Sequence, residues 1–177
     1  NGGPEKKNAS NNGILRDGKG SIYEGGFKVP FAMQWKGTLE KSVYDYPVSS
    51  LDILGTIADL ANVKISKDKP LDGANLIPFL NGENKSKPHD TIYLRQFDRN
   101  RFAVRNGNEK LIIPWKGGPP QLYDLSNDIG EQKDMAKDRP KRVQELNVLR
   151  KKWNANLKEP TFLGLIHTPG RANRRGK

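Results

Sequence analysis

The spacing of apolar side chains changes three times along the chain, and each spacing predicts a different element. Residues 1–13 are almost entirely polar, Gly or Pro, which predicts a loop. The apolar run VPFAMQW (Val29–Trp35) then predicts a short buried strand. The segment SSLDILGTIADLANV repeats its apolar residues at helical spacing, with Ser49 or Ser50 as N-cap and Asp52 in the first turn. A strand followed by a helix is typical of an α/β fold.

The pattern beyond Pro88 favours antiparallel strands followed by one helix. Four short segments with partial alternation, TIYLRQF, RFAVRNG, EKLIIPW and PQLYDLS, are separated by turns rich in Asn and Gly. Just before them, LDGANLIPFLNG predicts a short helix that stops at Asn81-Gly82. After Pro140 one apolar stripe predicts a helix that covers the sheet. The stripe consists of Val143, Leu146, Leu149, Trp153 and Leu157.

Composition narrows the function classes only a little. The 177 residues include no cysteine, which excludes disulfides, thiolate metal sites and cysteine nucleophiles within this sequence. No apolar run reaches the roughly 18 residues of a membrane span, so none is expected. The first residue is Asn1 rather than a methionine, which indicates a processed or partial chain.

The net charge of +11 raises the possibility of a polyanion partner. The charge is uneven, because four cations fall in the last seven residues: Arg171, Arg174, Arg175 and Lys177. No RNA-recognition signature, zinc finger or helix-turn-helix pattern accompanies it. A solvated surface with a basic tail is therefore favoured over a nucleic-acid interface.

A glycine-rich stretch near the start holds the one candidate for site chemistry that the local sequence offers. Lys19 lies between Gly18 and Gly20, which let the backbone approach a ligand closely. A phosphate-binding P-loop is excluded, because Gly20 stands where the pattern needs a hydroxyl for magnesium. Two alternatives stay open from the residues alone: a solvated lysine in a turn, or a lysine that contacts an anion.

Five blocks in register carry a resemblance to a known family: LRDGKGSIYEGGFKVPFAMQWKG, VSSLDILGTIADLANV, LDGANLIPFLNG, RFAVRNGNEKLI and QLYDLSNDIGEQKDMA. In this order they resemble the C-terminal part of type I sulfatases, the formylglycine-dependent enzymes. Among subgroups the chain is most similar to bacterial N-acetylgalactosamine-6-sulfatases or arylsulfatases. The resemblance implies that residues 1–88 end an alkaline-phosphatase-like α/β domain. Residues 89–158 would form a small α+β subdomain with a four-stranded antiparallel sheet and one covering helix, and residues 159–177 a basic extended tail.

The resemblance implies hydrolysis of sulfate esters, on sulfated sugars or glycosaminoglycan-like polysaccharides. The family's nucleophile block, C/S-x-P-x-R, its N-terminal Asp-Asp pair and its central histidines are absent here, and neither His89 nor His167 falls in a family block. We therefore expect this chain to be inactive alone and to need an N-terminal sulfatase segment as its partner. The alternative is a non-catalytic basic module that binds a polyanion, either a sulfated glycan or a nucleic acid.

The resemblance also implies roles for individual residues. Lys19 would contact the sulfate as a catalytic and substrate-binding residue, and Arg95 would contact a sulfated sugar. Asn1 would supply one oxygen ligand to a divalent cation, expected to be Ca²⁺, in a site completed outside this chain. The formylglycine would also lie outside it, and the localisation implied is periplasmic or secreted.

Three further polar residues are predicted to be structural. Arg16 is expected to form an ion pair with Glu24 or with an acid elsewhere. Glu24 is interpreted as a buried organiser of the loop. Asp52 is assigned to the dipole of its helix.

Overall fold

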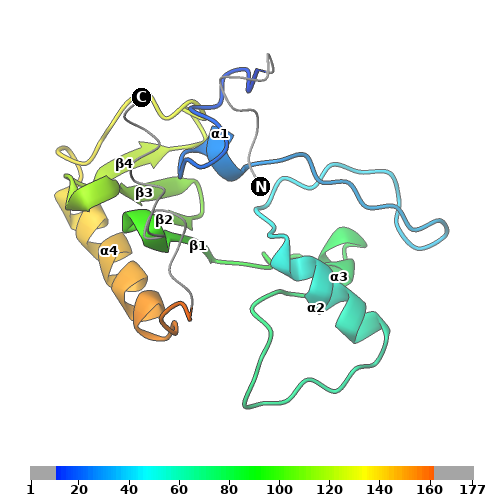
Figure 1. Cartoon of the computed structure of the whole chain (residues 1–177). Coiled ribbons are helices and arrows are strands. Elements are labelled where there is room, and N and C mark those ends of the chain that lie inside the picture. Colours follow the sequence, from blue (N-terminus) through cyan, green and yellow to red (C-terminus); the bar gives the residue numbers. More distant parts are fainter. Residues whose placement is uncertain (1–10, 162–177) are drawn as a thin grey trace, which may run out of the picture. The chain divides into compact units, whose positions relative to one another are not determined.

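The computed structural model describes residues 11–161, except for the side chain of Lys116. These residues form two compact units, whose elements can be followed in Figure 1 by their labels and residue colours. One unit combines residues 11–30 with residues 93–161, and the other contains residues 31–92. The segment that carries Lys19, up to residue 30, and the sheet from residue 93 onward thus belong to the same unit, although more than sixty residues separate them in the sequence.

The predicted four-stranded sheet is confirmed. Its strands are β1 (Thr91–Gln96), β2 (Arg101–Asn106), β3 (Glu109–Ile113) and β4 (Gln121–Asp124), adjacent in sequence order. β2 pairs antiparallel with β3, and β3 pairs antiparallel with β4. Two short 3-10 helices, η1 (Phe97–Arg99) and η2 (Trp115–Gly117), fill the longer connections. The tight turn between β2 and β3 uses Gly107 at φ +61°, a conformation that glycine adopts without a steric cost.

One face of the sheet is covered by the helix α4 (Pro140–Ala155). Val104, Leu111 and Leu122 share this face, and all are essentially inaccessible, as is Leu146 of the helix. The predicted helix after Pro140 is therefore confirmed. Trp153 stacks on Tyr93 with ring centroids 4.9 Å apart.

The apolar stripe predicted for this helix is only partly correct. Leu157 lies beyond the end of α4 at Ala155 and is 36% exposed. The helix ends before this position, so the side chain cannot continue the stripe. The stripe therefore runs from Val143 to Trp153.

The opposite face of the sheet is covered by the glycine-rich stretch. Ile22, which precedes the short helix α1 (Glu24–Phe27), packs in one core cluster with Ala103, Ile112 and Tyr123. Figure 1 shows α1 and α4 on opposite sides of the sheet. The stretch that carries Lys19 is therefore attached to the sheet through the apolar cluster around Ile22, separate from the core under α4.

The second unit contains α2 (Leu51–Leu60) and α3 (Ile77–Leu80), close to the predicted helices. Asp52 is completely buried, and its role is wider than the predicted interaction with the helix dipole. Its carboxylate accepts hydrogen bonds from the backbone N–H groups of Ser49 at 2.6 Å and Ala74 at 2.9 Å. His89 Nε2 also lies 2.7 Å from Asp52 Oδ1. Asp52 thus joins three segments of this unit.

The predicted buried strand at Val29–Trp35 is wrong. The segment forms neither helix nor strand, and Phe31 and Trp35 are 48% and 41% exposed. A strand needs a hydrogen-bonding neighbour, and in residues 11–161 the only sheet is the one formed by β1 to β4. The apolar side of α2 is likewise uncovered, since Leu54 and Ile57 are exposed while Gly55 and Thr56 are buried. The apolar pattern is real, but the described residues offer nothing for it to pack against.

We expect Leu146→Ala to lower the free energy of unfolding by about 2–5 kcal/mol, because it opens a cavity under an inaccessible side chain. Denaturant titration of the protein that contains this chain measures the change. Val148→Ala on the same helix is the matched control, since Val148 is 58% exposed. The control should change stability by no more than about 0.5 kcal/mol. Equal effects of the two variants would contradict the packing of α4 on the sheet.

Candidate functional site

Lys19 occupies an ordered turn, and its side chain points into solvent. The N–H of Ser21 donates to the carbonyl of Gly18 at 3.0 Å, and Gly20 between them has φ +87°. The Ser21 hydroxyl donates to Asp17 Oδ2 at 3.0 Å. Within the described part of the chain no hydrogen bond or ion pair engages the Lys19 ammonium, which is exposed. The turn therefore presents a cation that is available to an anion from outside.

The Lys19 turn is pressed against α1, which explains the Gly25-Gly26 pair. A Cβ on Gly25 would lie 2.3 Å from the carbonyl oxygen of Asp17 and 2.4 Å from that of Arg16. The N–H of Gly25 donates to the Arg16 carbonyl at 2.9 Å. Any larger residue at position 25 would push the turn away from α1.

Beneath α1 lies a buried charge cluster formed by Glu24, Lys110 and Glu131. Lys110 Nζ lies 2.9 Å from Glu24 Oε1 and 2.8 Å from Glu131 Oε1, and all three side chains are at most 1% exposed. The second Glu131 oxygen accepts a hydrogen bond from the backbone N–H of Glu24 at 2.6 Å. Glu24 is thus the buried organiser that the sequence predicted.

The buried charge cluster holds two carboxylates for one ammonium. Burial raises the pKa of Glu131, although the Lys110 ammonium acts in the opposite direction. The nearest further cation is Arg105, whose Nη1 lies 4.0 Å from Glu24 Oε2. Desolvation of such a cluster offsets much of its Coulomb attraction, so its main effect is to fix geometry.

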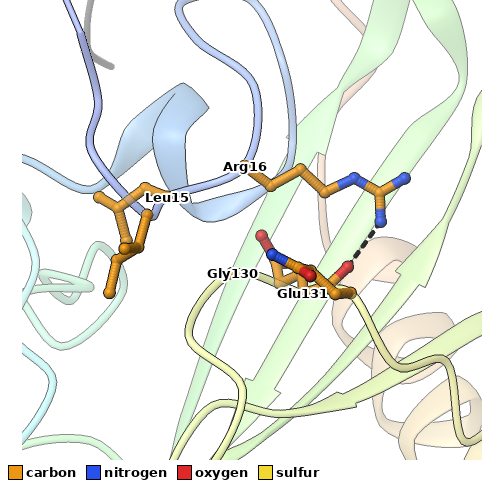
Figure 2. A pocket seen from close by; sticks show the side chains of 6 residues that line it. Leu15, Arg16, Gly130 and Glu131 are labelled. Carbon is orange, nitrogen blue, oxygen red and sulfur yellow. Dashed lines mark hydrogen bonds between the residues drawn. The ribbon is translucent and has the colours of Figure 1, made fainter.

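Arg16 does not pair with Glu24 as predicted. Its Nη1 donates to the Tyr123 hydroxyl at 3.0 Å and to the backbone carbonyl of Glu131 at 2.7 Å. The guanidinium also lies 3.9 Å from the centroid of the Tyr23 ring. Figure 2 shows the hydrogen bond from Arg16 to Glu131 at the edge of a shallow hollow formed by Ile14, Leu15, Arg16, Gly130, Glu131 and Gln132. Lys110 takes the place at Glu24 that the sequence assigned to Arg16.

The end of β1 reaches the Lys19 turn from another direction. Gln96 Nε2 donates to the carbonyl of Gly20 at 3.3 Å. Next to it, Arg95 contacts Glu159 at 3.3 Å and lies 4.8 Å from the centroid of the Phe97 ring. Arg95, the predicted sugar contact, is therefore one strand position from a residue that touches the turn, and its present partner is an exposed glutamate.

The predicted metal ligand Asn1 lies outside the described residues. Between residues 11 and 161 no group of three or more His, Cys, Asp or Glu side chains is placed to hold a metal ion. The side chains described here therefore do not form a cation site by themselves. His167 and the basic residues after Arg171 also lie outside the described range.

Sequence reasoning missed Lys110 and Glu131. Lys110 had a usable signal, because alternation in β3 places it on the same face as the buried Ile112. A charged residue at an inward-facing strand position predicts a buried partner. Glu131 had no such signal, since it is one of several acidic residues in a loop.

Comparison with known proteins identifies the class to which this fold and turn belong. Residues 17–159 match the family model described as N-sulphoglucosamine sulphohydrolase, C-terminal. Arylsulfatase A from Bos taurus is 31% identical over 86% of this chain. The N-acetylgalactosamine-6-O-sulfatase of Bacteroides thetaiotaomicron is 30% identical over 77% of it. The crystal structure of Ps i-CgsB in complex with k-i-k-neocarrahexaose superposes with a TM-score of 0.81, at 29% identity over 93% of this chain.

The chain belongs to the sulfatase family and corresponds to its C-terminal region. It spans 37% of the length of bovine arylsulfatase A and 29% of the bacterial relative. The predicted resemblance is thus confirmed. In residues 11–161, none of the helices is long and apolar enough to cross a membrane.

We expect Lys110→Met to destabilise the protein by about 3–5 kcal/mol, because it leaves two carboxylates buried without their ammonium. Glu131→Gln should cost less, since it keeps an acceptor for the Glu24 N–H and removes a charge that burial disfavours. Thermal unfolding of the complete protein measures both variants. The interpretation is contradicted if Glu131→Gln is the more damaging of the two.

The stability difference between Glu131→Gln and the unmodified protein should depend on pH with a defined sign. The pKa of Glu131 is raised above its ordinary value of 4.5 in the folded state. Its favourable contribution is therefore present below that value and is lost as the pH rises through the folded pKa. The variant should gain in relative melting temperature as the pH rises from 4.5, and a decline would contradict the burial of this carboxylate.

Proposed function

We propose that this chain is the C-terminal part of a sulfatase that hydrolyses sulfate esters of sulfated sugars or glycosaminoglycan-like polysaccharides, with Lys19 contacting the sulfate. The observation that carries the proposal is the turn itself. It holds an exposed, unpaired ammonium among the described residues while its backbone is fastened to a buried core. The relatives named above support the substrate class, since they are an arylsulfatase, an N-acetylgalactosamine-6-O-sulfatase and a protein solved in complex with k-i-k-neocarrahexaose.

The chemistry of sulfate-ester hydrolysis explains why a lysine would be placed here. Negative charge develops on the leaving oxygen as the ester bond breaks, and a fixed cation nearby stabilises that charge. Lys19 is a compact point charge on a turn whose backbone is held, which suits that task. In the family the formylglycine supplies the nucleophile, and here it would come from outside this chain.

The predicted cation enters the proposal only through Asn1. We propose that Asn1 is one oxygen ligand of a divalent cation, with Ca²⁺ as the expected ion. Because the described residues form no cation site, no step of the reaction is assigned to the metal.

The exposed apolar residues support the proposed domain organisation. In the complete protein residues 1–88 would end the alkaline-phosphatase-like α/β domain, residues 89–158 would form the small subdomain, and residues 159–177 a basic tail. Val29–Trp35 and the apolar side of α2 would pack against the rest of that α/β domain, which explains their exposure here. We also propose that the complete protein is periplasmic or secreted, the localisation that the family resemblance implies.

In the complete protein Lys19→Ala should lower kcat for a sulfate ester by about 10²–10³, the usual loss on removing one preorganised electrostatic contact. Lys19→Arg should restore little, because a planar guanidinium does not replace a point charge in a tight site. Turnover of para-nitrophenyl sulfate gives the measurement. Lys28→Ala is the matched control, since Lys28 is an exposed lysine a few residues away. Full activity of Lys19→Ala would refute the role of Lys19.

Arg95→Ala should raise KM for a sulfated oligosaccharide by about tenfold, the effect of losing one charged contact of roughly 1.4 kcal/mol. It should leave kcat for a small aryl sulfate unchanged, because that substrate does not extend to β1. Glu159→Gln is the control that frees Arg95 from its present partner. An unchanged KM with Arg95→Ala would remove Arg95 from the substrate-binding residues.

The 177-residue chain alone should not hydrolyse an aryl sulfate, because one lysine cannot replace a set of groups that act as a unit. It should also bind a hydrophobic dye through the exposed residues of α2, and Ile57→Lys should reduce that binding. Co-expression with the upstream sulfatase segment should restore activity. Turnover by the purified chain would contradict the proposal.

A further inference from the structure

We propose that Glu131 and Lys110 are positioning residues that fix the Lys19 turn to the sheet, an inference that rests on the proposed function of Lys19. The strongest observation is that residues on both sides of the Lys19 turn, Arg16 and Glu24, donate hydrogen bonds to the same residue, Glu131. On the N-terminal side Arg16 donates to the Glu131 carbonyl at 2.7 Å. On the C-terminal side the backbone N–H of Glu24 donates to the Glu131 carboxylate at 2.6 Å. Lys19 lies between these two attachment points.

Glu131 can fix the turn because its own backbone and side chain are restrained. Its backbone has φ +52°, a left-handed conformation that costs a residue with a Cβ free energy and persists only where the surroundings enforce it. The preceding Gly130 approaches the turn so closely that a Cβ there would lie 2.9 Å from the Ile14 carbonyl oxygen. The Glu131 side chain is completely buried. These constraints leave Glu131 a single position relative to the turn.

Lys110 connects this joint to the rigid part of the molecule. It lies on β3, which pairs with a neighbour on both sides, and its Nζ contacts both Glu24 and Glu131 within 3 Å. Its ammonium also lies 4.4 Å from the centroid of the ring of Phe27, the last residue of α1. With Lys110 removed, the two carboxylates would repel each other and α1 would lose its link to the strand.

A fixed turn matters because lysine is long and flexible. The ammonium of Lys19 can be directed at one point only if its backbone is held, since within residues 11–161 no hydrogen bond or ion pair engages this exposed side chain. A displacement of the order of 1 Å at a reacting centre can lower a rate by about a hundredfold. The buried charge cluster would therefore influence turnover without touching the substrate.

The test is a double-mutant cycle in the complete protein, with kcat for para-nitrophenyl sulfate as the readout. Lys110→Met and Glu131→Met, which removes the carboxylate acceptor of the Glu24 N–H, are each made in the unmodified protein and in the Lys19→Ala variant. With Lys19 present, each should lower kcat by about 10- to 100-fold. With Lys19 already replaced, each should change kcat by less than about threefold, because its effect passes through Lys19. Equal losses in both backgrounds would show a general structural role and overturn the proposal.

A second measurement does not depend on activity and serves if Lys110→Met folds poorly. Hydrogen exchange at the amides of Ser21 and Gly25 should become faster in Glu131→Met, while exchange in β2 and β3 stays unchanged. Unchanged exchange at these two amides would overturn the proposal. Lys133→Met is the matched control, since Lys133 is exposed two residues from Glu131 and should affect neither readout.

Different results would overturn the role of Lys19 and the positioning role of Glu131 and Lys110. If Lys19→Ala keeps full activity, the proposed function of Lys19 is wrong and the positioning role falls with it. If Lys19→Ala is impaired but the losses are equal in both backgrounds, only the positioning role is wrong.

Discussion

The contact of one buried ammonium with two buried carboxylates is the interaction on which the sheet unit depends. Lys110 reaches Glu24 in α1 and Glu131 in the loop after β4, all three inaccessible to solvent. Such a cluster adds little net stability, because desolvation opposes the attraction. What it provides is a fixed relation between three segments that are far apart in the sequence. The Lys19 turn inherits its position from that relation.

The two faces of the sheet differ in composition and in what they bind. The face under α4 is a purely apolar core, with Leu146 against Val104, Leu111 and Leu122. The opposite face mixes an apolar cluster around Ile22 with the buried charge cluster. The first face secures the sheet, and the second attaches the turn to it.

The sheet and α4 could be predicted because their signals are local. Alternation, glycine-containing turns and Pro140 at a helix start identify these elements from a few neighbouring residues. The strand predicted at Val29–Trp35 was wrong because its signal is not local. An apolar run becomes a strand only if a partner strand is available. The pattern recorded the requirement for burial but not where the covering partner is.

The site was only partly predictable. Lys19 was identified by the resemblance of its block, because a lysine between two glycines is not distinctive by itself. Arg16 was predicted to pair with Glu24 or with an acid elsewhere, whereas its partners are Tyr123 and the Glu131 carbonyl, more than a hundred residues away. Pairings of that range depend on how the sheet brings loops together, which no short sequence pattern encodes.

The most direct test of the role of Lys19 is a crystal structure of the complete protein with inorganic sulfate bound. We predict that Lys19 Nζ lies within about 4 Å of a sulfate oxygen, the range of an ion pair, on a turn still joined to Glu131. A sulfate bound elsewhere in the active site, with Lys19 directed into solvent, would contradict it.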